Sequence, residues 1–233
     1  MIKTVSHDGV TCIFDSKDHT YKVSGQKLIS VTQLKSKYFP EFETLKIAKG
    51  YAQRNGYEVE DVLHKWKVLG EKGAAKGNAI HKYCECILEG KDVELSSEFV
   101  QYQVALDIVL SQLKKVWQLV GTEFIVFSKD LQLAGQIDLL MRKDDIVYIV
   151  DWKTDKQINN KNNWGRKALP PIEYLDDCNF HQHTVQLNLY EHLLRTEKYF
   201  DDVIFFKRII HVMPGKCIRY RVPTIDVSEV LKK

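Results

Sequence analysis

The sequence predicts an α/β domain with a mixed central β-sheet flanked by helices. Three observations support this class. Apolar residues recur with helical spacing over 96–120, two adjacent strand patterns follow at 131–142 and 146–154, and a further helix (183–199) and strand (203–212) come after them. Helices and strands in such an order build a sheet covered by helices. With 233 residues, 44% of them hydrophobic, the chain suffices for one large domain or two small ones.

Short strands and a first helix are predicted ahead of residue 40. Runs of alternating apolar and polar residues mark the strands, at residues 10–14, 20–23 and 27–31. Ser30 or Thr32 is placed to cap a helix over 33–39, because a hydroxyl oxygen accepts a hydrogen bond from the first free amides of a helix. The chain therefore begins with an N-terminal β-hairpin region followed by a short helix.

Helices are also predicted over residues 43–90. Glycines punctuate this pattern, at Gly50, Gly56, Gly70, Gly73 and Gly77. Within it, residues 78–88 gather apolar side chains on one face, which is typical of a buried helix. Residues 120–127 are a strand candidate after the longer helix. Short strand and helix patterns close the chain, the strand at 219–222.

The hairpin predicted over residues 131–154 is the most informative part of the chain. If its polar turn centres between residues 144 and 145, Asp138 lies directly opposite Asp151. Side chains alternate between the two faces of a strand, so Asp151 and Lys153 share a face. Opposite residues in an antiparallel pair have Cβ atoms roughly 4.5–5.5 Å apart. The hairpin thus brings together two carboxylates and a lysine.

Two interpretations of this trio are open. An Asp-x-Lys sequence on a strand can be a surface ion pair. Against this, residues 146–150 are apolar on both faces, which is typical of an interior strand. Charges that end such a strand are unfavourable unless they are paired or bind a metal. Close carboxylates repel one another unless a cation lies between them, and Mg²⁺ or Mn²⁺ suits their oxygen atoms. We therefore expect one of these ions here.

Further polar residues accompany the hairpin. His81 and Glu85 are four residues apart on a predicted helix and share its face. Glu123 lies in the strand before the hairpin, and Gln186 and Tyr190 are again four residues apart on a later helix. Taken singly, each of these residues fits an ordinary structural or solvent-facing position.

Together, the residues resemble the PD-(D/E)XK nucleases of RecB type. The resemblance rests on Gly-x-x-x-His at 77–81, Glu123, Gly-x-x-Asp at 135–138, Asp-x-Lys-Thr at 151–154 and Gln-x-x-x-Tyr at 186–190. These motifs occur in the family's order and spacing over residues 75–212. Ser30-Val-Thr32 and Val150-Asp-Trp-Lys-Thr154 are most similar to the mitochondrial genome maintenance exonucleases and related phage and viral exonucleases. Ile137 replaces a proline of the family pattern.

The resemblance implies a restriction-endonuclease-like core at residues 77–233. Strands and a basic, arch-like helical region at residues 1–76 precede it. The implied metal ligands are His81, Asp138, Asp151, the main-chain carbonyl of Trp152 and, as an additional ligand, Glu123. The implied catalytic residues are Asp138, Asp151, Lys153, Gln186 and Tyr190, with Glu85 supporting the site from behind. In these roles Lys153 orients the attacking water and steadies the charge on the phosphate.

Two basic segments are candidates for binding the substrate. Lysine and arginine are dense over residues 46–82 and 153–167, with aromatic residues interleaved. Cations that track phosphates and rings that stack on bases suit single-stranded nucleic acid, although a solvated helix face and a polar loop share this composition. The candidate DNA-binding residues are Lys72, Lys76, Trp66, Lys156, Trp164 and Arg166. Residues 155–182 form a long connection of the kind that is often functional.

The function expected from these observations is that of a metal-dependent DNA exonuclease in replication, recombination or repair, acting on single strands or free ends. Candidate partners are a recombinase, a helicase or a single-strand-binding protein. Two alternatives stay open: a structure-specific or restriction-like endonuclease on the same fold, and a non-catalytic DNA-binding subunit of a recombination complex.

Composition narrows the setting of the protein. The net charge is only +3, so the overall charge says little about binding partners. The five cysteines are odd in number and scattered, which does not fit a disulfide framework. Some relatives carry a four-cysteine iron–sulfur cluster, but we expect none here because the required C-terminal cysteines are missing. No run approaches the ~20 apolar residues of a membrane span, and no signal or organellar targeting segment is evident. We therefore expect an intracellular protein, in the cytoplasm of a bacterial host or a virus-infected cell, with no membrane contact.

Overall fold

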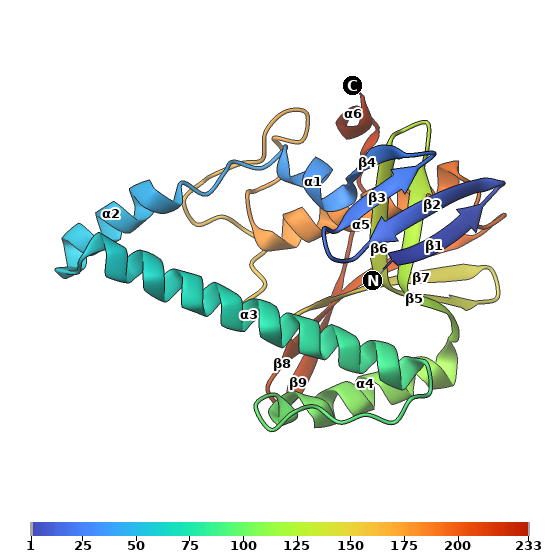
Figure 1. Cartoon of the computed structure of the whole chain (residues 1–233), viewed down its shortest axis with the longest axis horizontal. Coiled ribbons are helices and arrows are strands. Elements are labelled where there is room, and N and C mark those ends of the chain that lie inside the picture. Colours follow the sequence, from blue (N-terminus) through green and yellow to red (C-terminus); the bar gives the residue numbers. More distant parts are fainter. Residues whose placement is uncertain (1, 233) are drawn as a thin grey trace.

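A computed structural model describes residues 2–232 of the chain (Figure 1). The strands are β1 (Ile2–His7), β2 (Val10–Asp15), β3 (Thr20–Val23), β4 (Gln26–Ser30), β5 (Gln118–Ser128), β6 (Leu133–Lys143), β7 (Ile146–Lys153), β8 (Ile204–Met213) and β9 (Lys216–Arg221). The helices are α1 (Val31–Ser36), α2 (Thr44–Asn55), α3 (Val59–Leu88), a short 3₁₀ helix η1 (Val100–Tyr102), α4 (Gln103–Val116), α5 (Asn179–Thr196) and α6 (Ser228–Leu231).

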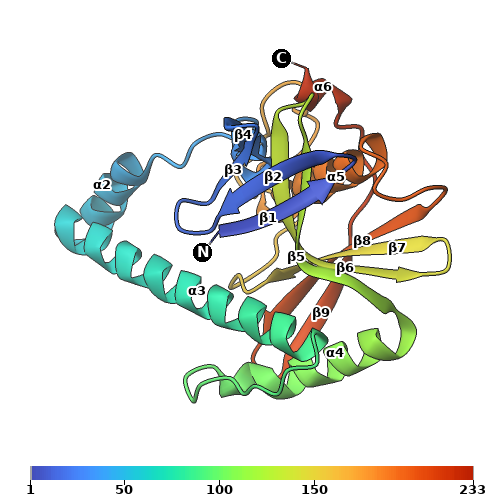
Figure 2. The same cartoon turned by 45° about the vertical axis from the view of Figure 1, so that its right-hand side comes forward.

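The strands join one mixed sheet with helices on both faces. Its order is β1-β2-β3-β4-β6-β7-β8-β9, and β5 pairs with β6 beside this path. Alternate residues of the central strands point to opposite sides: Leu140 and Ile149 pack against α5, whereas Leu139 and Val150 pack against α3 and α4. Figures 1 and 2 show α5 and the α3–α4 pair on these opposite sides. The predicted fold class is confirmed.

Strand β6 organises the centre of the sheet because three strands pair with it. β5 runs antiparallel to it from Leu133 to Arg142 and so takes up one of its edges. β4 and β7 therefore share the other edge, β4 at Leu133 and Ala134, and β7 from Leu139 onward. Residues 135–138 lie between these two paired segments. The sheet opens there, at the end of the strand segment that carries Asp138.

The predicted hairpin has the expected register. Lys143 pairs with Ile146 and Leu139 with Val150, so the turn is centred between residues 144 and 145. Asp138 and Asp151 are the next positions along this register, and the N–H of Trp152 donates to Asp138 Oδ2 at 2.8 Å. Strand β1 was not expected, because its polar residues hide the weak alternation of an edge strand.

The first helices follow the sequence signals with one exception. Ser30 caps α1 and forms a capping box with Gln33, as one of the two predicted caps. Gly56 ends α2 in the left-handed conformation, with φ 68°. Gly70, Gly73 and Gly77 do not interrupt α3, which runs unbroken for 30 residues. The division expected between residues 76 and 77 thus separates regions of one continuous helix.

The later elements lie close to their expected positions. α5 begins at Asn179, four residues earlier than predicted, and β9 begins at Lys216 instead of residue 219. Between β7 and α5, the long connection is irregular apart from an isolated bridge between Lys167 and Asp176. Within residues 2–232, none of the helices has both the length and the apolar character needed to cross a bilayer. The five cysteines are free thiols, and all but Cys217 are buried.

Candidate active site

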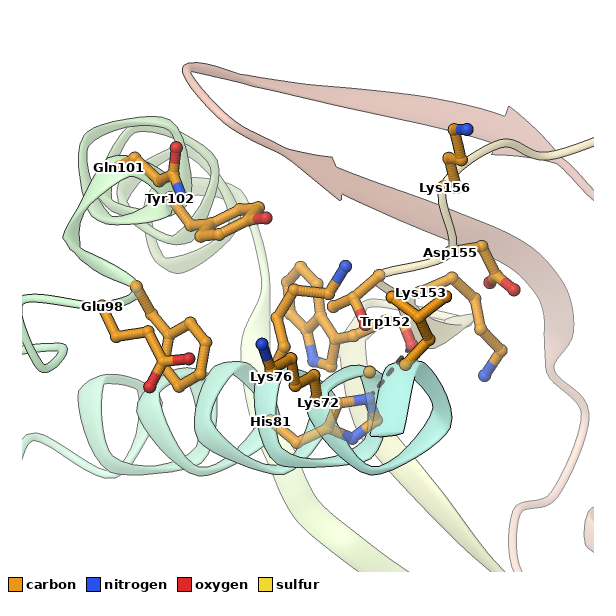
Figure 3. A pocket seen from close by; sticks show the side chains of 14 residues that line it. Lys72, Lys76, His81, Glu98, Gln101, Tyr102, Trp152, Lys153, Asp155 and Lys156 are labelled. Atoms are coloured by element: carbon orange, nitrogen blue, oxygen red, sulfur yellow. Dashed lines mark hydrogen bonds between the residues drawn. The ribbon is translucent and has the colours of Figure 1, made fainter. Parts of the chain in front are cut away.

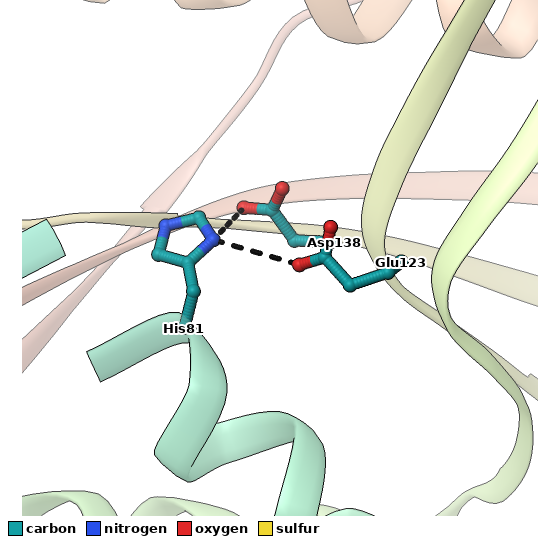
Figure 4. A group of neighbouring side chains, drawn as sticks. All are labelled: His81, Glu123 and Asp138. Atoms are coloured by element: carbon teal, nitrogen blue, oxygen red, sulfur yellow. Dashed lines mark ion pairs between the residues drawn. The ribbon is translucent and has the colours of Figure 1, made fainter. Parts of the chain in front are cut away.

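Three side chains from three elements meet at the opening in the sheet (Figure 4). His81 projects from α3, Glu123 from β5 and Asp138 from β6. His81 Nδ1 lies 3.8 Å from Glu123 Oε1 and 3.7 Å from Asp138 Oδ2. One potential ligand atom from each residue lies within 4.8 Å of the others. Two carboxylates and an imidazole at these distances form a candidate site for a divalent metal.

The orientation of His81 suits a metal ligand. Its Nε2 lies 3.1 Å from the main-chain carbonyl oxygen of Trp152, so this nitrogen carries the proton and donates it (Figure 3). In the neutral ring that binds a metal, Nδ1 is then the unprotonated nitrogen, and it is the atom that faces the two carboxylates. Histidines that bind metals commonly donate their other N–H to a backbone carbonyl in this way.

Glu123 holds an unfavourable backbone conformation. Its φ of 46° lies in the left-handed region, within a strand and without the freedom of glycine. On either side, Thr122 pairs with Leu139 and Phe124 with Ile137, so Glu123 lies opposite Asp138. Such strain costs about 1–3 kcal/mol and persists where the surroundings enforce it, often at functional sites. The strained residue is thus the one whose carboxylate lies beside that of Asp138.

The electrostatics of the cluster also favour a bound cation. Burial and the nearby Asp151 carboxylate together raise the pKa of Asp138 to about 6 in spite of His81. Burial alone would lower the pKa of His81, but Asp138 and Glu123 outweigh burial and raise it to about 9. The protein thus concentrates negative charge at a place where water solvates it poorly. A divalent cation would relieve this repulsion, so the residues present fit a metal such as Mg²⁺ or Mn²⁺.

Asp151 and Lys153 form a buried ion pair beside this cluster. Lys153 Nζ lies 2.5 Å from Asp151 Oδ2, and Asp151 is only 2% exposed. Gln186 Nε2 approaches the other oxygen, Asp151 Oδ1, at 3.4 Å. Asp151 is therefore held by a lysine and an amide, and it is not among the residues whose ligand atoms gather with His81. Its predicted role as a direct metal ligand stays a prediction.

The charge states of the pair follow from their mutual contact. Burial alone would lower the pKa of Lys153, but Asp151 and Asp138 outweigh burial and raise it above the ordinary lysine value. Burial alone would raise the pKa of Asp151, but Lys153 and His183 outweigh burial and lower it. At neutral pH the lysine is therefore a cation and Asp151 an anion. A protonated Lys153 can stabilise a negatively charged phosphate but cannot accept a proton from water.

Gln186 and Tyr190 project from one face of α5 toward these carboxylates. Gln186 Nε2 lies 3.3 Å from Tyr190 Oη, so the two side chains form one polar group beside Asp151. The Tyr190 ring lies so close to Gly135 that a Cβ built there would be 2.5 Å from Tyr190 Cε1. Glycine in the Gly-x-x-Asp motif therefore lets the α5 helix approach the strand that carries Asp138.

A comparison with known protein families identifies one family for this chain. The model of the PD-(D/E)XK nuclease superfamily matches residues 57–232, which is most of the chain and includes all the residues described above. The chain belongs to the PD-(D/E)XK nuclease superfamily. Its mixed sheet with flanking helices is consistent with the restriction-endonuclease-like core of that superfamily. Membership assigns the protein to the metal-dependent nucleases, hydrolases that act on DNA, commonly with Mg²⁺ or Mn²⁺.

Other comparisons add little to the PD-(D/E)XK assignment. No curated protein gives a significant match to this chain. A solved structure described as "Crystal structure of SSO0001" is 15% identical, with a TM-score of 0.33, and the alignment covers 87% of this chain and 70% of that one. At this TM-score the likeness carries no part of the assignment.

Residues outside the PD-(D/E)XK match also reach the site. Lys35 of α1 donates from Nζ to Gln186 Oε1 at 3.2 Å. His19, from the turn between β2 and β3, lines a cavity of about 210 Å³ together with Glu123 and Asp138. Neither residue was predicted, since no local pattern connects an N-terminal lysine or histidine to motifs more than 100 residues away.

A second buried histidine borders the ion pair of the PD-(D/E)XK site. His183 Nε2 lies 3.7 Å from Asp155 Oδ2, and the nearby imidazole lowers the pKa of Asp155. Burial lowers the pKa of His183. Position 183 opens the predicted helix, but its sequence context gave no signal for a role in the site.

The residues predicted to bind DNA lie in different environments. Lys72, Lys76 and Lys156 line one cavity of about 730 Å³ beside Lys153. Trp66 packs near the small core between α2 and α3, and Trp164 is 89% exposed on the long connection. Arg166 pairs with Asp177 at 3.0 Å, and Glu85 pairs with Lys82 at 2.8 Å in a cavity that His81 also lines. The roles of these residues in the PD-(D/E)XK nuclease stay predictions.

Proposed function

We propose that the protein is a metal-dependent DNA exonuclease that hydrolyses phosphodiester bonds at free ends, with single strands as its preferred substrate. The proposal rests on one observation: a candidate metal site and a buried ion pair lie side by side where the sheet opens. His81, Glu123 and Asp138 form a candidate metal site, and the buried pair of Asp151 and Lys153 lies directly beside it. A phosphodiester that meets both groups encounters a hard cation and a fixed ammonium.

His81, Glu123 and Asp138 would hold the metal. A bound Mg²⁺ or Mn²⁺ supplies a water of lowered pKa and offsets negative charge on the phosphate. Asp138 is also fixed by the N–H of Trp152, and His81 by the carbonyl of the same residue. A single backbone unit at the end of β7 therefore orients two of the three ligands.

Lys153 acts on the phosphate through its charge. Because Asp151 keeps it protonated, it stabilises the negative charge that develops on the phosphate oxygens and orients the attacking water. Asp151 in turn is positioned by Gln186, which contacts both Tyr190 and Lys35. These residues align the reacting groups from the side of α5.

The finer placement of the protein rests on sequence motifs. The Ser30-Val-Thr32 segment and the Asp-x-Lys-Thr motif at 151–154 support the RecB-type branch, near the mitochondrial genome maintenance exonucleases and their phage and viral relatives. That placement supports a role in replication, recombination or repair inside a bacterial or virus-infected cell. A recombinase, helicase or single-strand-binding protein is the proposed class of partner, and we propose that no iron–sulfur cluster is present.

The proposed preference for free ends is open to a direct test. Purified protein is incubated with end-labelled linear single strands, linear duplexes and covalently closed single-stranded circles, in Mg²⁺, Mn²⁺ or EDTA. We expect rapid loss of label from linear single strands in either metal, slow digestion of duplexes and no cleavage in EDTA. Rapid cutting of the closed circles would support the endonuclease alternative instead.

Matched carboxylate variants separate catalysis from binding. Asp151→Asn keeps the shape of the side chain but removes its charge, and we expect cleavage to disappear. Asp145→Ala changes an exposed carboxylate in the turn of the same hairpin, and we expect unchanged cleavage. If the wild-type protein leaves all linear strands intact in both metals but still binds them, the non-catalytic subunit is the better description.

A further inference from the structure

A large cavity lies next to the candidate active site (Figure 3). It has a volume of about 730 Å³, and three parts of the chain form its walls. The first wall is the middle of α3, the second is the segment 98–102 that leads into α4, and the third is the segment 152–156 at the end of β7. His81 and Lys153 belong to its lining, so the cavity opens onto the proposed catalytic groups.

Lysines supply most of the charged groups on two of these walls, where Asp155 is a carboxylate among them. Lys72 and Lys76 come from α3, and Lys156 comes from the start of the long connection. Among residues 2–232, no carboxylate forms an ion pair with any of these three lysines. Their charges are therefore available to an anionic ligand that enters the cavity.

The facing wall is aromatic. Phe99 and Tyr102 line it, and the Tyr102 ring faces Lys76, whose Nζ lies 5.9 Å from the ring centre. This wall is anchored, because the N–H of Gly215 donates to the carbonyl of Gln101 at 3.0 Å. Glu98 lies on the same side of the cavity as Phe99, and its negative charge keeps phosphates away from this aromatic side. One side of the cavity thus suits a flat apolar group and the other suits an anion.

We propose that this cavity binds unpaired nucleotides of the substrate strand next to the bond that is cut, with a base stacked on Phe99 and phosphates held by Lys72, Lys76 and Lys156. The proposal rests on the proposed nuclease function and extends it to the recognition of single strands. Cationic grooves with aromatic platforms bind single strands without sequence preference. A base in a duplex is already stacked and paired, so its face is not open to Phe99.

The cavity has a size that fits this ligand. Pockets of ~300–1,000 Å³ hold drug-sized molecules, the size class of one or two nucleotides and far below that of a double helix. The aromatic residues predicted from the sequence, Trp66 and Trp164, do not line the cavity. Phe99 and Tyr102 therefore take the stacking role that was expected of those tryptophans.

Binding is measured without cleavage. A fluorescein-labelled oligothymidine and a blunt duplex of equal length are titrated with full-length protein in EDTA, and fluorescence anisotropy reports the affinity at several salt concentrations. Phe99→Leu removes the ring but keeps an apolar side chain, and we expect single-strand binding to weaken roughly 5- to 100-fold at an unchanged salt dependence. Phe99→Tyr should restore wild-type affinity, and Val100→Ala, an exposed neighbour, should have no effect.

Substitution of the lysines, in contrast, should change the salt dependence of single-strand binding. Lys72→Gln and Lys76→Gln each remove one cation that faces a phosphate, and each is expected to reduce the slope of log affinity against log salt by about 0.7. Lys67→Gln, on the same helix but outside the cavity, should leave the slope unchanged. Two walls with separate roles therefore give two separable readouts.

A measurement on the wild-type protein needs no variant. An oligonucleotide with one 2-aminopurine base should lose fluorescence on binding, because stacking on an aromatic ring quenches this base. Wild-type affinity in Phe99→Leu, equal losses for single strand and duplex, or 2-aminopurine emission that does not change would overturn the proposal. A protein that binds as expected but never cleaves would instead overturn only the nuclease function.

Discussion

The buried charge of Lys35 destabilises the folded protein, although this side chain contacts Gln186 at the candidate active site. Burial and the nearby Lys153 cation together lower the pKa of Lys35 to about 8. The charged form is therefore less favourable in the folded than in the unfolded protein. This cost is fully present below about pH 8 and decreases as pH rises toward 10.5, the ordinary lysine value.

We predict that Lys35→Met raises the melting temperature at pH 7, by about 2–4 °C for each kcal/mol regained, and that the gain shrinks above pH 8. Cleavage should fall roughly tenfold, because Gln186 loses the donor that fixes it against Asp151. Thermal unfolding at pH 7 and pH 10 and single-turnover cleavage check both parts. A gain in melting temperature that is equal at both pH values would contradict the assigned cause.

For single residues, the sequence predicts site side chains that lie close together in one motif. It does not predict side chains that are distant in sequence and are brought together only by the tertiary structure. Asp138, Asp151 and Lys153 follow from strand alternation and one turn, since all lie within a single hairpin. Lys35 reaches Gln186 across 151 positions of sequence, and only the pairing of β4 with β6 brings α1 to that place. The strained φ of Glu123 has no sequence signal, because glutamate rarely adopts it.

The contact between β6 and α5 depends on a missing side chain. Gly135 faces the Tyr190 ring, and Val31 of α1 packs on the same spot, so three elements meet without space for a methyl group. Any side chain here must push the tyrosine, and with it Gln186, away from the carboxylates.

We predict that Gly135→Ala destabilises the protein by about 1–3 kcal/mol through overpacking and strongly reduces cleavage. Gly70→Ala is the matched control, since a Cβ at this position in α3 meets nothing within 4 Å. It should stabilise the protein by about 0.5–1 kcal/mol. Urea unfolding and cleavage rates test the pair, and wild-type values for Gly135→Ala would mean that α5 tolerates displacement.

Helices and strands were predicted correctly where a local sequence pattern defines their bounds. They were predicted less well where tertiary packing determines how far an element extends. The hairpin register is correct because the turn residues and the apolar run agree. α3 continues through Gly70, Gly73 and Gly77 against their low helix propensity. Residues 80, 84 and 88 of this helix are buried against α4 and the sheet, and this packing outweighs the propensity of the glycines.

The whole molecule extends beyond the region that the family model matches. Before residue 57, the apolar side chains of β2, β3 and β4 form a core with Ile125 and Phe127 of β5 and Ala134 of β6. β4 also completes the edge of β6, and α1 carries Lys35 to the site. The N-terminal residues are therefore part of the nuclease and not an appendage.

We predict that a chain beginning at residue 57 loses more than ~5 kcal/mol, comparable to the whole stability of many domains, and shows no cooperative unfolding. Removal of residues 1–8 alone, which deletes only the half-buried edge strand β1, should leave a cooperative transition at a lower temperature. Near-ultraviolet circular dichroism during heating distinguishes the two. A shortened chain from residue 57 with the melting temperature and activity of the full chain would contradict this account.

The continuity of α3 has a consequence for the products of the reaction. One rigid rod carries both Lys72 and His81, and between them it rises by about 14 Å at ~1.5 Å per residue. A strand held at one of these positions and cut at the other is thereby measured against a fixed length. Under the proposed function, the helix would keep a constant distance between the phosphate held at Lys72 and the bond cut near His81.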